Sequence, residues 1–89
     1  MEEYLIDGIL SRGHCIQTEI VNTFIKDLRI LGRNLKDVAI VDNCVIGFCF
    51  QLDNGIPIYP YEGDENDNSL YDIAEFLIAN KEALDIRVN

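Results

Sequence analysis

The sequence has few basic residues: seven Lys and Arg stand against sixteen Asp and Glu, and the net charge is −9. Nucleic acids and anionic membranes are held through clustered Lys and Arg, so this balance argues against both as partners. No apolar run approaches the roughly 20 residues that span a bilayer. The first ten residues lack the basic start and long apolar stretch of a secretory signal. We therefore expect a protein of the cytoplasm or nucleus that binds neither membranes nor nucleic acids.

Cysteine and histidine are also scarce. Cys15, Cys44 and Cys49 are an odd number of cysteines without C-x-x-C spacing, which favours a reducing compartment and inert thiols over a disulfide framework. His14 is the only histidine, so a His-based catalytic triad has little support. What remains is a chain of 89 residues, 48% of them apolar, which is enough for one packed domain and too short for two.

The first half of the chain predicts a hairpin and a short helix. Residues 8–21 mix β-branched and polar side chains and are punctuated by Gly8 and Gly13, a pattern typical of a strand or hairpin. From residue 24 the apolar positions recur at helical spacing. They predict a short amphipathic helix over about residues 26–32, ended by Gly32.

The second half predicts strands followed by a longer helix. Residues 37–43, DVAIVDN, form an apolar run without alternation, as in a central strand buried on both faces of a parallel sheet. Residues 45–52 are a second strand candidate. The stretch that follows belongs at a sheet edge or in an extended loop, because Pro57 and Pro60 lack amide donors. Ser69 is predicted to cap a helix whose apolar stripe covers a sheet face. Together these elements indicate an α/β domain.

Asp42 and Asn43 follow the predicted central strand. Both residue types are common in turns, so a simple turn is one interpretation. Ligands of open α/β sheets, however, bind at the carboxyl ends of the strands, which is where these two residues lie. The local pattern does not decide between a turn and half of a metal site.

The wider sequence resembles a known family. FIKDLRILGRNLKDVAIVDN, followed by FQLDNGIPI, GDENDNSLYDIAEFL and DIR, is similar to the C-terminal half of the NLI-interacting-factor-like phosphatases. That family includes the small phosphatases of the RNA polymerase II C-terminal domain and belongs to the haloacid dehalogenase superfamily. The resemblance covers about residues 9–88. It implies part of a haloacid-dehalogenase-like, Rossmann-type fold: a central parallel strand, short edge strands and two helices.

The resemblance also implies roles for individual residues. Lys26 matches the family's phosphate-binding lysine, and Asn43 would place its side-chain oxygen on Mg²⁺ with Asp42 beside it. SRGHC resembles the family's FREHC, which makes Arg12 a contact for the substrate phosphate. These residue types suit the chemistry, since Mg²⁺ prefers oxygen ligands and an ammonium binds phosphate as a point charge.

The sequence departs from the family in what it lacks. Family members carry D-x-D-x-T at the end of an earlier strand, with the first Asp as nucleophile and the second as general acid and base. No two Asp residues here are separated by one position. The phosphate-binding Ser or Thr of the family has no counterpart, and Cys44 and Val45 replace the usual Ser-Pro after V-D-N. We therefore interpret residues 1–89 as a single truncated phosphatase-like domain.

Three functional hypotheses follow. The first is the C-terminal portion of a Mg²⁺-dependent protein serine/threonine phosphatase that acts through an aspartyl phosphate when complete and is inactive alone. Its partners would be a phosphoprotein substrate or a complementing chain, and uncovered apolar surface would favour self-association. The second is a non-catalytic module that binds phosphate or protein. The third, a calcium loop of the EF-hand type from Asp64, is weakened because Ser69 stands where that loop needs Gly.

Overall fold

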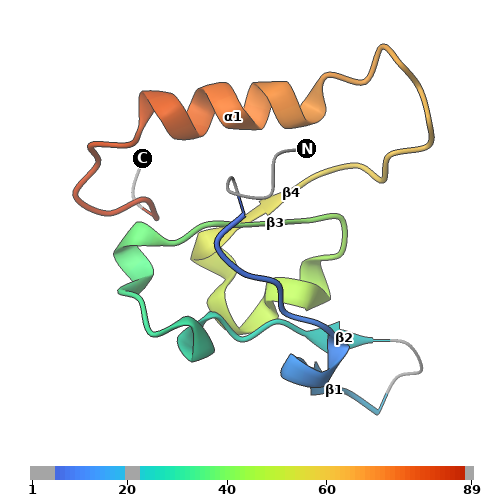
Figure 1. Cartoon of the computed structure of the whole chain (residues 1–89), viewed down its shortest axis with the longest axis vertical. Coiled ribbons are helices and arrows are strands. Elements are labelled where there is room, and N and C mark those ends of the chain that lie inside the picture. Colours follow the sequence, from blue (N-terminus) through green and yellow to red (C-terminus); the bar gives the residue numbers. More distant parts are fainter. Residues whose placement is uncertain (1–5, 20–22, 88–89) are drawn as a thin grey trace.

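The computed structural model describes residues 6–19 and 23–87. Its strands are β1 (Ile16–Gln17), β2 (Phe24–Ile25), β3 (Ile40–Asp42) and β4 (Gly55–Pro57). The 3-10 helix η2 (Arg12–His14) precedes β1, η3 (Leu28–Leu31) and η4 (Leu35–Asp37) lie between β2 and β3, and the kinked segment η5 (Val45–Asn54) joins β3 to β4. One α-helix, α1 (Ser69–Ala79), follows β4. In Figure 1 the β3–β4 pair lies between α1 and the β1–β2 hairpin, which are at opposite ends of the molecule.

The strand or hairpin predicted over residues 8–21 is confirmed in part, because β1 lies in this range and its partner β2 lies beyond it. β1 and β2 pair antiparallel, with Ile16 opposite Ile25. The amphipathic helix predicted over about residues 26–32 is present only as one turn of 3-10 helix, η3, and the apolar residues Phe24 and Ile25 before it belong to β2. Gly32 ends that turn as predicted, since its φ of 66° lies in the left-handed region that glycine adopts without strain.

The strand predicted over residues 37–43 is confirmed in its second half. β3 pairs parallel with β4, with Ile40 opposite Gly55 and Asp42 opposite Pro57. The ladder continues one step further, where the Ile58 amide donates to the Asp42 carbonyl at 3.1 Å. Among the described residues, β4 is the only strand hydrogen-bonded to β3. Two parallel strands therefore carry Asp42 and Asn43 to one end of the sheet.

The strand predicted over residues 45–52 is wrong, because this segment forms η5. η5 is not one regular helix, because its backbone leaves helical geometry at Phe48 (φ −124°, ψ 27°) and at Gln51 (φ −132°, ψ 64°). It therefore consists of short turns joined across a kink, and Phe48, Gln51 and Asn54 are its buried side chains. The Asn54 amide donates to the carbonyls of Leu35 and Val38 at 2.6 and 2.8 Å, so the buried polar group is satisfied.

Helix α1 begins at Ser69 as predicted, but another residue caps it. The Asp67 carboxylate accepts the Ser69 amide at 2.9 Å, and this bond lowers the pKa of Asp67. Figure 1 shows α1 running alongside the β3–β4 pair. Its apolar stripe is only partly covered, since Leu70 and Ile78 are 67% and 66% exposed. No helix in the described ranges is both long and apolar enough to span a bilayer.

The hydrophobic core is small. Its buried apolar members come from β2, η3, the residue that follows η4, and η5: Ile25, Leu28, Val38 and Phe48. Phe48 is the most buried of them at 3% exposure, and Gly55 lies against its ring so closely that a Cβ at that position would overlap it. The core is therefore on the hairpin side of the β3–β4 pair and not under α1.

Candidate functional site

A lysine and an aspartate from separate strands meet at the carboxyl end of β3. Lys26 follows β2 directly and Asp42 is the last residue of β3. The Lys26 Nζ lies 2.7 Å from Asp42 Oδ2, a distance typical of a charge-assisted hydrogen bond. The Asp42 side chain is 7% exposed, whereas that of Lys26 is 51% exposed. The pair thus presents a buried carboxylate and an ammonium that solvent can reach.

Asp42 is held in its charged form. Burial by itself would raise the pKa of this carboxyl, but the hydrogen bond from Lys26 and the backbone amides of Cys44 and Asn43 outweigh it and lower the pKa. The Cys44 amide donates to Oδ1 at 2.9 Å, so each carboxylate oxygen has a donor. The site therefore contains a fixed negative charge beside a cation.

Gly47 contacts both Lys26 and Asp42. Its carbonyl accepts the Lys26 amide at 2.8 Å, which ties the residue after β2 to the first turn of η5. Gly47 is buried, and a Cβ there would overlap the Asp42 carboxylate. Sequence reasoning missed this residue. The available signal was a lone glycine inside an apolar run, which often marks a close backbone approach.

A second set of bonds fixes the segment that follows Lys26. Asp27 Oδ2 accepts Arg29 Nη2 at 2.7 Å, and this bond is the main cause that lowers the pKa of Asp27. The Gln51 amide donates to Asp27 Oδ1 at 2.9 Å, and Gln51 Oε1 accepts the Leu28 amide at 3.0 Å. The buried Gln51 side chain of η5 therefore fixes the chain immediately after Lys26.

Asn43 is exposed and lines the same open groove as Lys26 and Asp42. Mg²⁺ is usually held by one or two carboxylates, with waters and substrate phosphate completing an octahedron. Asp42 and Asn43 offer oxygen atoms that fit part of such a shell. Among residues 6–19 and 23–87 no three His, Cys, Asp or Glu side chains are grouped to hold a metal ion. Asp42 and Asn43 could therefore supply only part of the ligand shell of a Mg²⁺ ion.

Arg12 lies away from this group. Its guanidinium carbon is 5.2 Å from the centre of the Phe24 ring, a cation–π contact within the hairpin region. Arg12 does not line the groove that Lys26, Asp42 and Asn43 share. The structure thus brings three of the four sequence-predicted site residues together and leaves the fourth beside β2.

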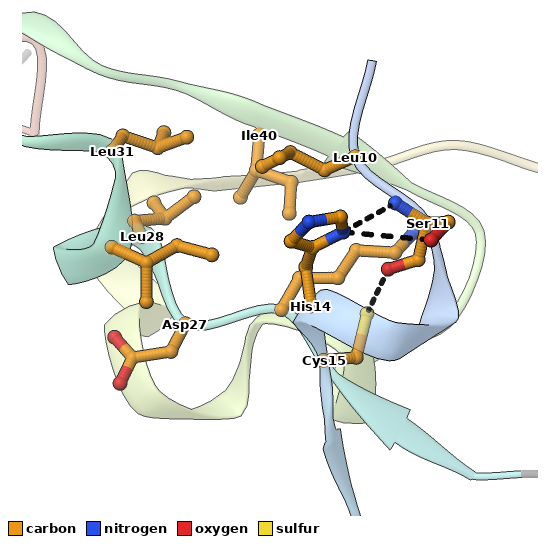
Figure 2. Close-up of a pocket in the computed structure, with 10 residues that line it drawn as sticks. Leu10, Ser11, His14, Cys15, Asp27, Leu28, Leu31 and Ile40 are labelled. Carbon is orange, nitrogen blue, oxygen red and sulfur yellow. Dashed lines mark hydrogen bonds between the residues drawn. The ribbon is translucent and has the colours of Figure 1, made fainter.

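An apolar pocket lies behind Lys26. It has a volume of about 230 Å³, and Figure 2 shows side chains from the N-terminal segment, η3 and β3 around it, among them Leu10, Leu28 and Ile40. His14 extends along its edge, where its Nδ1 accepts the Ser11 amide at 3.0 Å. His14 is exposed and has a local structural role, as its isolation in the sequence suggested. Lys26 borders this pocket and the groove alike.

The calcium-loop hypothesis gains nothing from the geometry. The loop would run from Asp64 to Glu75, but α1 begins inside it at Ser69. The Asp64 carboxylate instead accepts the Asn66 amide at 2.9 Å, which closes a local turn. Residues that a calcium ion would gather are thus spread along a helix and a turn.

Comparison with known proteins identifies the family. The model of the NLI interacting factor-like phosphatase family matches residues 1–87. This chain belongs to that family. It is 42% identical over 78 residues to "CTD small phosphatase-like protein 2" of Dictyostelium discoideum and 44% identical over 70 residues to "CTD small phosphatase-like protein 3" of Caenorhabditis elegans. The matches cover 88% and 79% of this chain.

A human relative of the same family is also similar. "Carboxy-terminal domain RNA polymerase II polypeptide A small phosphatase 1" is 36% identical over 53 residues, or 60% of this chain. The chain spans only 13%, 24% and 20% of the lengths of these three relatives. The family resemblance that the sequence suggested is therefore confirmed, and the chain corresponds to a minor portion of each relative.

Proposed function

We propose that this chain supplies the phosphate-binding and metal-side portion of a Mg²⁺-dependent protein serine/threonine phosphatase. The observation that carries the proposal is the Lys26–Asp42 pair, in which Nζ and Oδ2 are 2.7 Å apart at the carboxyl end of β3. Lys26 is half exposed and can turn its ammonium toward a phosphate in the groove. Family membership supports the same reaction class.

The site residues of this chain would have separate roles in binding phosphate and Mg²⁺. Lys26 would neutralise charge on the phosphoryl group, and Asp42 would keep that ammonium in place. Asp42 and Asn43 would hold Mg²⁺ on the groove side of β3. The ion, when bound, would polarise the phosphoryl oxygens. In the complete domain an Asp from a D-x-D-x-T segment would attack phosphorus and form an aspartyl phosphate, and that segment is not in this sequence.

The missing nucleophile predicts that the chain alone turns over no phosphate ester. The test is Mg²⁺-dependent hydrolysis of p-nitrophenyl phosphate by the purified chain, beside Lys26→Ala and Asp42→Ala. No release of p-nitrophenol above the buffer rate is expected from any of the three. Turnover that both substitutions abolish would contradict the proposal, because the chain would then contain a nucleophile of its own.

A second candidate is a non-catalytic module that binds phosphate or protein. The same absence of D-x-D favours it, since Lys26, Asp42 and Asn43 are retained without the nucleophile. The two candidates differ when a polypeptide bearing D-x-D-x-T is added in trans. Restored Mg²⁺-dependent turnover would support the phosphatase portion. Phosphate binding without turnover, under conditions where the two polypeptides associate, would support the binding module.

Self-association follows from the apolar surface that the described residues leave open. Leu70 and Ile78 on α1 are exposed, and β3 has one hydrogen-bonded neighbour within the described ranges. A complementing polypeptide or a second copy of the chain would cover such a surface. Light scattering over a range of concentrations would test this, and a monomer at every concentration would contradict it.

A further inference from the structure

The groove that contains Lys26 and Asp42 extends well beyond them. It passes from the carboxyl end of β3, along residues 58–61 after β4, to the first turns of α1. Val41, Ile58 and Ala74 give it an apolar floor. It is open along its length and has a volume of about 1010 Å³, far more than one phosphate group needs. Its size fits several residues of an extended polypeptide.

One wall of the groove is acidic. Asp64, Glu65 and Asp67 line it, and all three lie in the segment that joins β4 to α1. None of the ion pairs among the described residues involves these three carboxylates. The only basic residue that lines the groove is Lys26, which is paired with Asp42. The far part of the groove therefore carries negative charge with no cation from the described residues to balance it.

Tyrosines line the same part of the groove. Tyr59, Tyr61 and Tyr71 are 87%, 68% and 73% exposed, so their rings face solvent and are not used in the core. Aromatic faces attract Lys ammonium and Arg guanidinium groups. An apolar floor, aromatic rings and unbalanced carboxylates together complement a peptide with basic side chains and would repel an acidic one.

We propose that this groove binds the basic residues that flank the phosphorylated residue of a polypeptide substrate. The phosphate would lie at Lys26, and a Lys or Arg a few residues away would lie between the acidic wall and the tyrosines. This inference rests on the proposed function, because it takes the Lys26 end of the groove as the phosphate site. It adds a specificity that family membership does not supply: the preferred substrates are basic phosphopeptides.

The test measures binding of fluorescently labelled peptides to the full chain by anisotropy in the presence of Mg²⁺. Three peptides are compared: a phosphoserine peptide flanked by two Lys, the same peptide with Gln in place of both Lys, and the Lys peptide with unmodified Ser. The wild-type chain should bind the first about ten-fold more tightly than either of the others. Raising the salt concentration should weaken the Lys-dependent part of binding, because the charges are exposed.

Variants of the groove residues test which side chains bind the Lys residues of the peptide. Asp64→Asn combined with Glu65→Gln should weaken binding of the Lys phosphopeptide about five-fold. The matched control, Glu62→Gln with Glu75→Gln, removes the same charge from two exposed residues outside the groove and should change binding less than two-fold. Tyr71→Leu should weaken binding about three-fold, whereas Tyr71→Phe, which keeps the ring, should not.

The outcomes separate this inference from the proposed function. Equal binding of the Lys and Gln phosphopeptides, or equal losses in the groove and control double variants, would overturn the basic-substrate inference while leaving phosphate binding intact. The Lys peptide could also bind equally well with and without its phosphate, and equally well to the wild type and to Lys26→Ala. That result would overturn the proposed phosphate site, and with it the substrate assignment of the groove. Absence of binding by all three peptides would overturn the inference outright.

Discussion

The two sides of the β3–β4 pair are built differently. On the hairpin side, buried Phe48 packs against Gly55, and Gln51 and Asn54 satisfy backbone groups of neighbouring segments with hydrogen bonds of 2.6–3.0 Å. On the α1 side, Leu70 and Ile78 are about two-thirds exposed, and no residue of α1 is buried. The site residue Lys26 belongs to the first side, and its groove opens toward the second.

The positions of the site residues and the properties of the groove surface therefore depend on different forces. Short hydrogen bonds and close packing around η5 position Lys26 and Asp42, so substitutions there should disturb the whole domain. The side chains on the α1 side face solvent. Substitutions there should change the free energy of unfolding little and should instead alter association and ligand binding.

Phe48→Ala should cause the largest loss of stability. Removing a phenyl ring that is 3% exposed leaves a cavity against Gly55, at a cost of about 3–5 kcal/mol. The control is Phe50→Ala, because Phe50 is in the same helix and 48% exposed. Urea unfolding followed by circular dichroism measures both variants. Equal destabilisation by the two would contradict the assignment of the core.

Gly47→Ala should destabilise the chain by about 1–3 kcal/mol, since the added methyl group overlaps the Asp42 carboxylate. It should also weaken the Lys26–Asp42 contact, which an NMR titration of the Asp42 carboxyl would report as a pKa nearer its ordinary value of 3.8. Gly8→Ala is the control, because nothing lies within 4 Å of a Cβ built there. An unchanged titration of Asp42 in Gly47→Ala would show that Gly47 does not position the pair.

Asn54→Ala should cost about 1–3 kcal/mol, because it removes the side-chain donor to the buried Val38 carbonyl and the shorter of two hydrogen bonds to the Leu35 carbonyl. Asn66→Ala, in an exposed turn, should change the free energy of unfolding by less than about 0.5 kcal/mol. Thermal unfolding compares the two. A near-neutral Asn54→Ala would indicate that water replaces the side chain and that η5 is not fixed by it.

Stability should fall in acid. The folded-state pKa values of Asp42, Asp27 and Asp85 all lie below the ordinary 3.8, that of Asp85 at about 2. Groups of this kind contribute stability that is complete above the unfolded pKa and is lost as pH falls through the folded pKa. Urea unfolding at pH 6, 4 and 2.5 should show most of the loss below pH 4. Asp42→Asn should have a shallower dependence, and an unchanged dependence would refute the role of this carboxylate.

Ile78→Ser should have the smallest effect on stability and a clear effect on association. Ile78 is 66% exposed, so the free energy of unfolding should change by less than about 0.5 kcal/mol. If α1 is covered by a second copy, sedimentation velocity at high concentration should show less dimer than for the wild type. Leu35→Ser, which alters a partly buried residue on the hairpin side, should instead destabilise the monomer.

The sequence predicted those elements in which the apolar pattern matches a single geometry. β3 was recognisable as an unbroken apolar run and α1 as a stripe at helical spacing. η5 was not, because residues 45–52 form an apolar run that reads as a strand, whereas the folded segment makes short turns broken at Phe48 and Gln51. The hydrogen bonds of Gln51 and Asn54 with distant backbone groups form only in the folded chain, so no local pattern reveals them.

The site was predicted by resemblance and not by spacing. Lys26 and Asp42 are sixteen residues apart, and no local rule brings them within 2.7 Å of each other. The family resemblance predicted that both serve one site; the structure places their side chains in contact, and their roles in phosphate and metal binding stay predictions. Gly47 escaped notice because its role depends on a close approach to Asp42 that only the folded chain creates.

An NMR titration of the ¹⁵N-labelled chain with phosphoserine in the presence of Mg²⁺ would show whether phosphate binds beside Lys26. We expect saturable shifts of the Asn43 side-chain amide and of the Cys44 and Gly47 backbone amides, all lost in Lys26→Ala. Folding of that variant is checked from its remaining amide signals. Shifts that persist in Lys26→Ala, or that occur only away from Asn43, would contradict a phosphate site at the carboxyl end of β3.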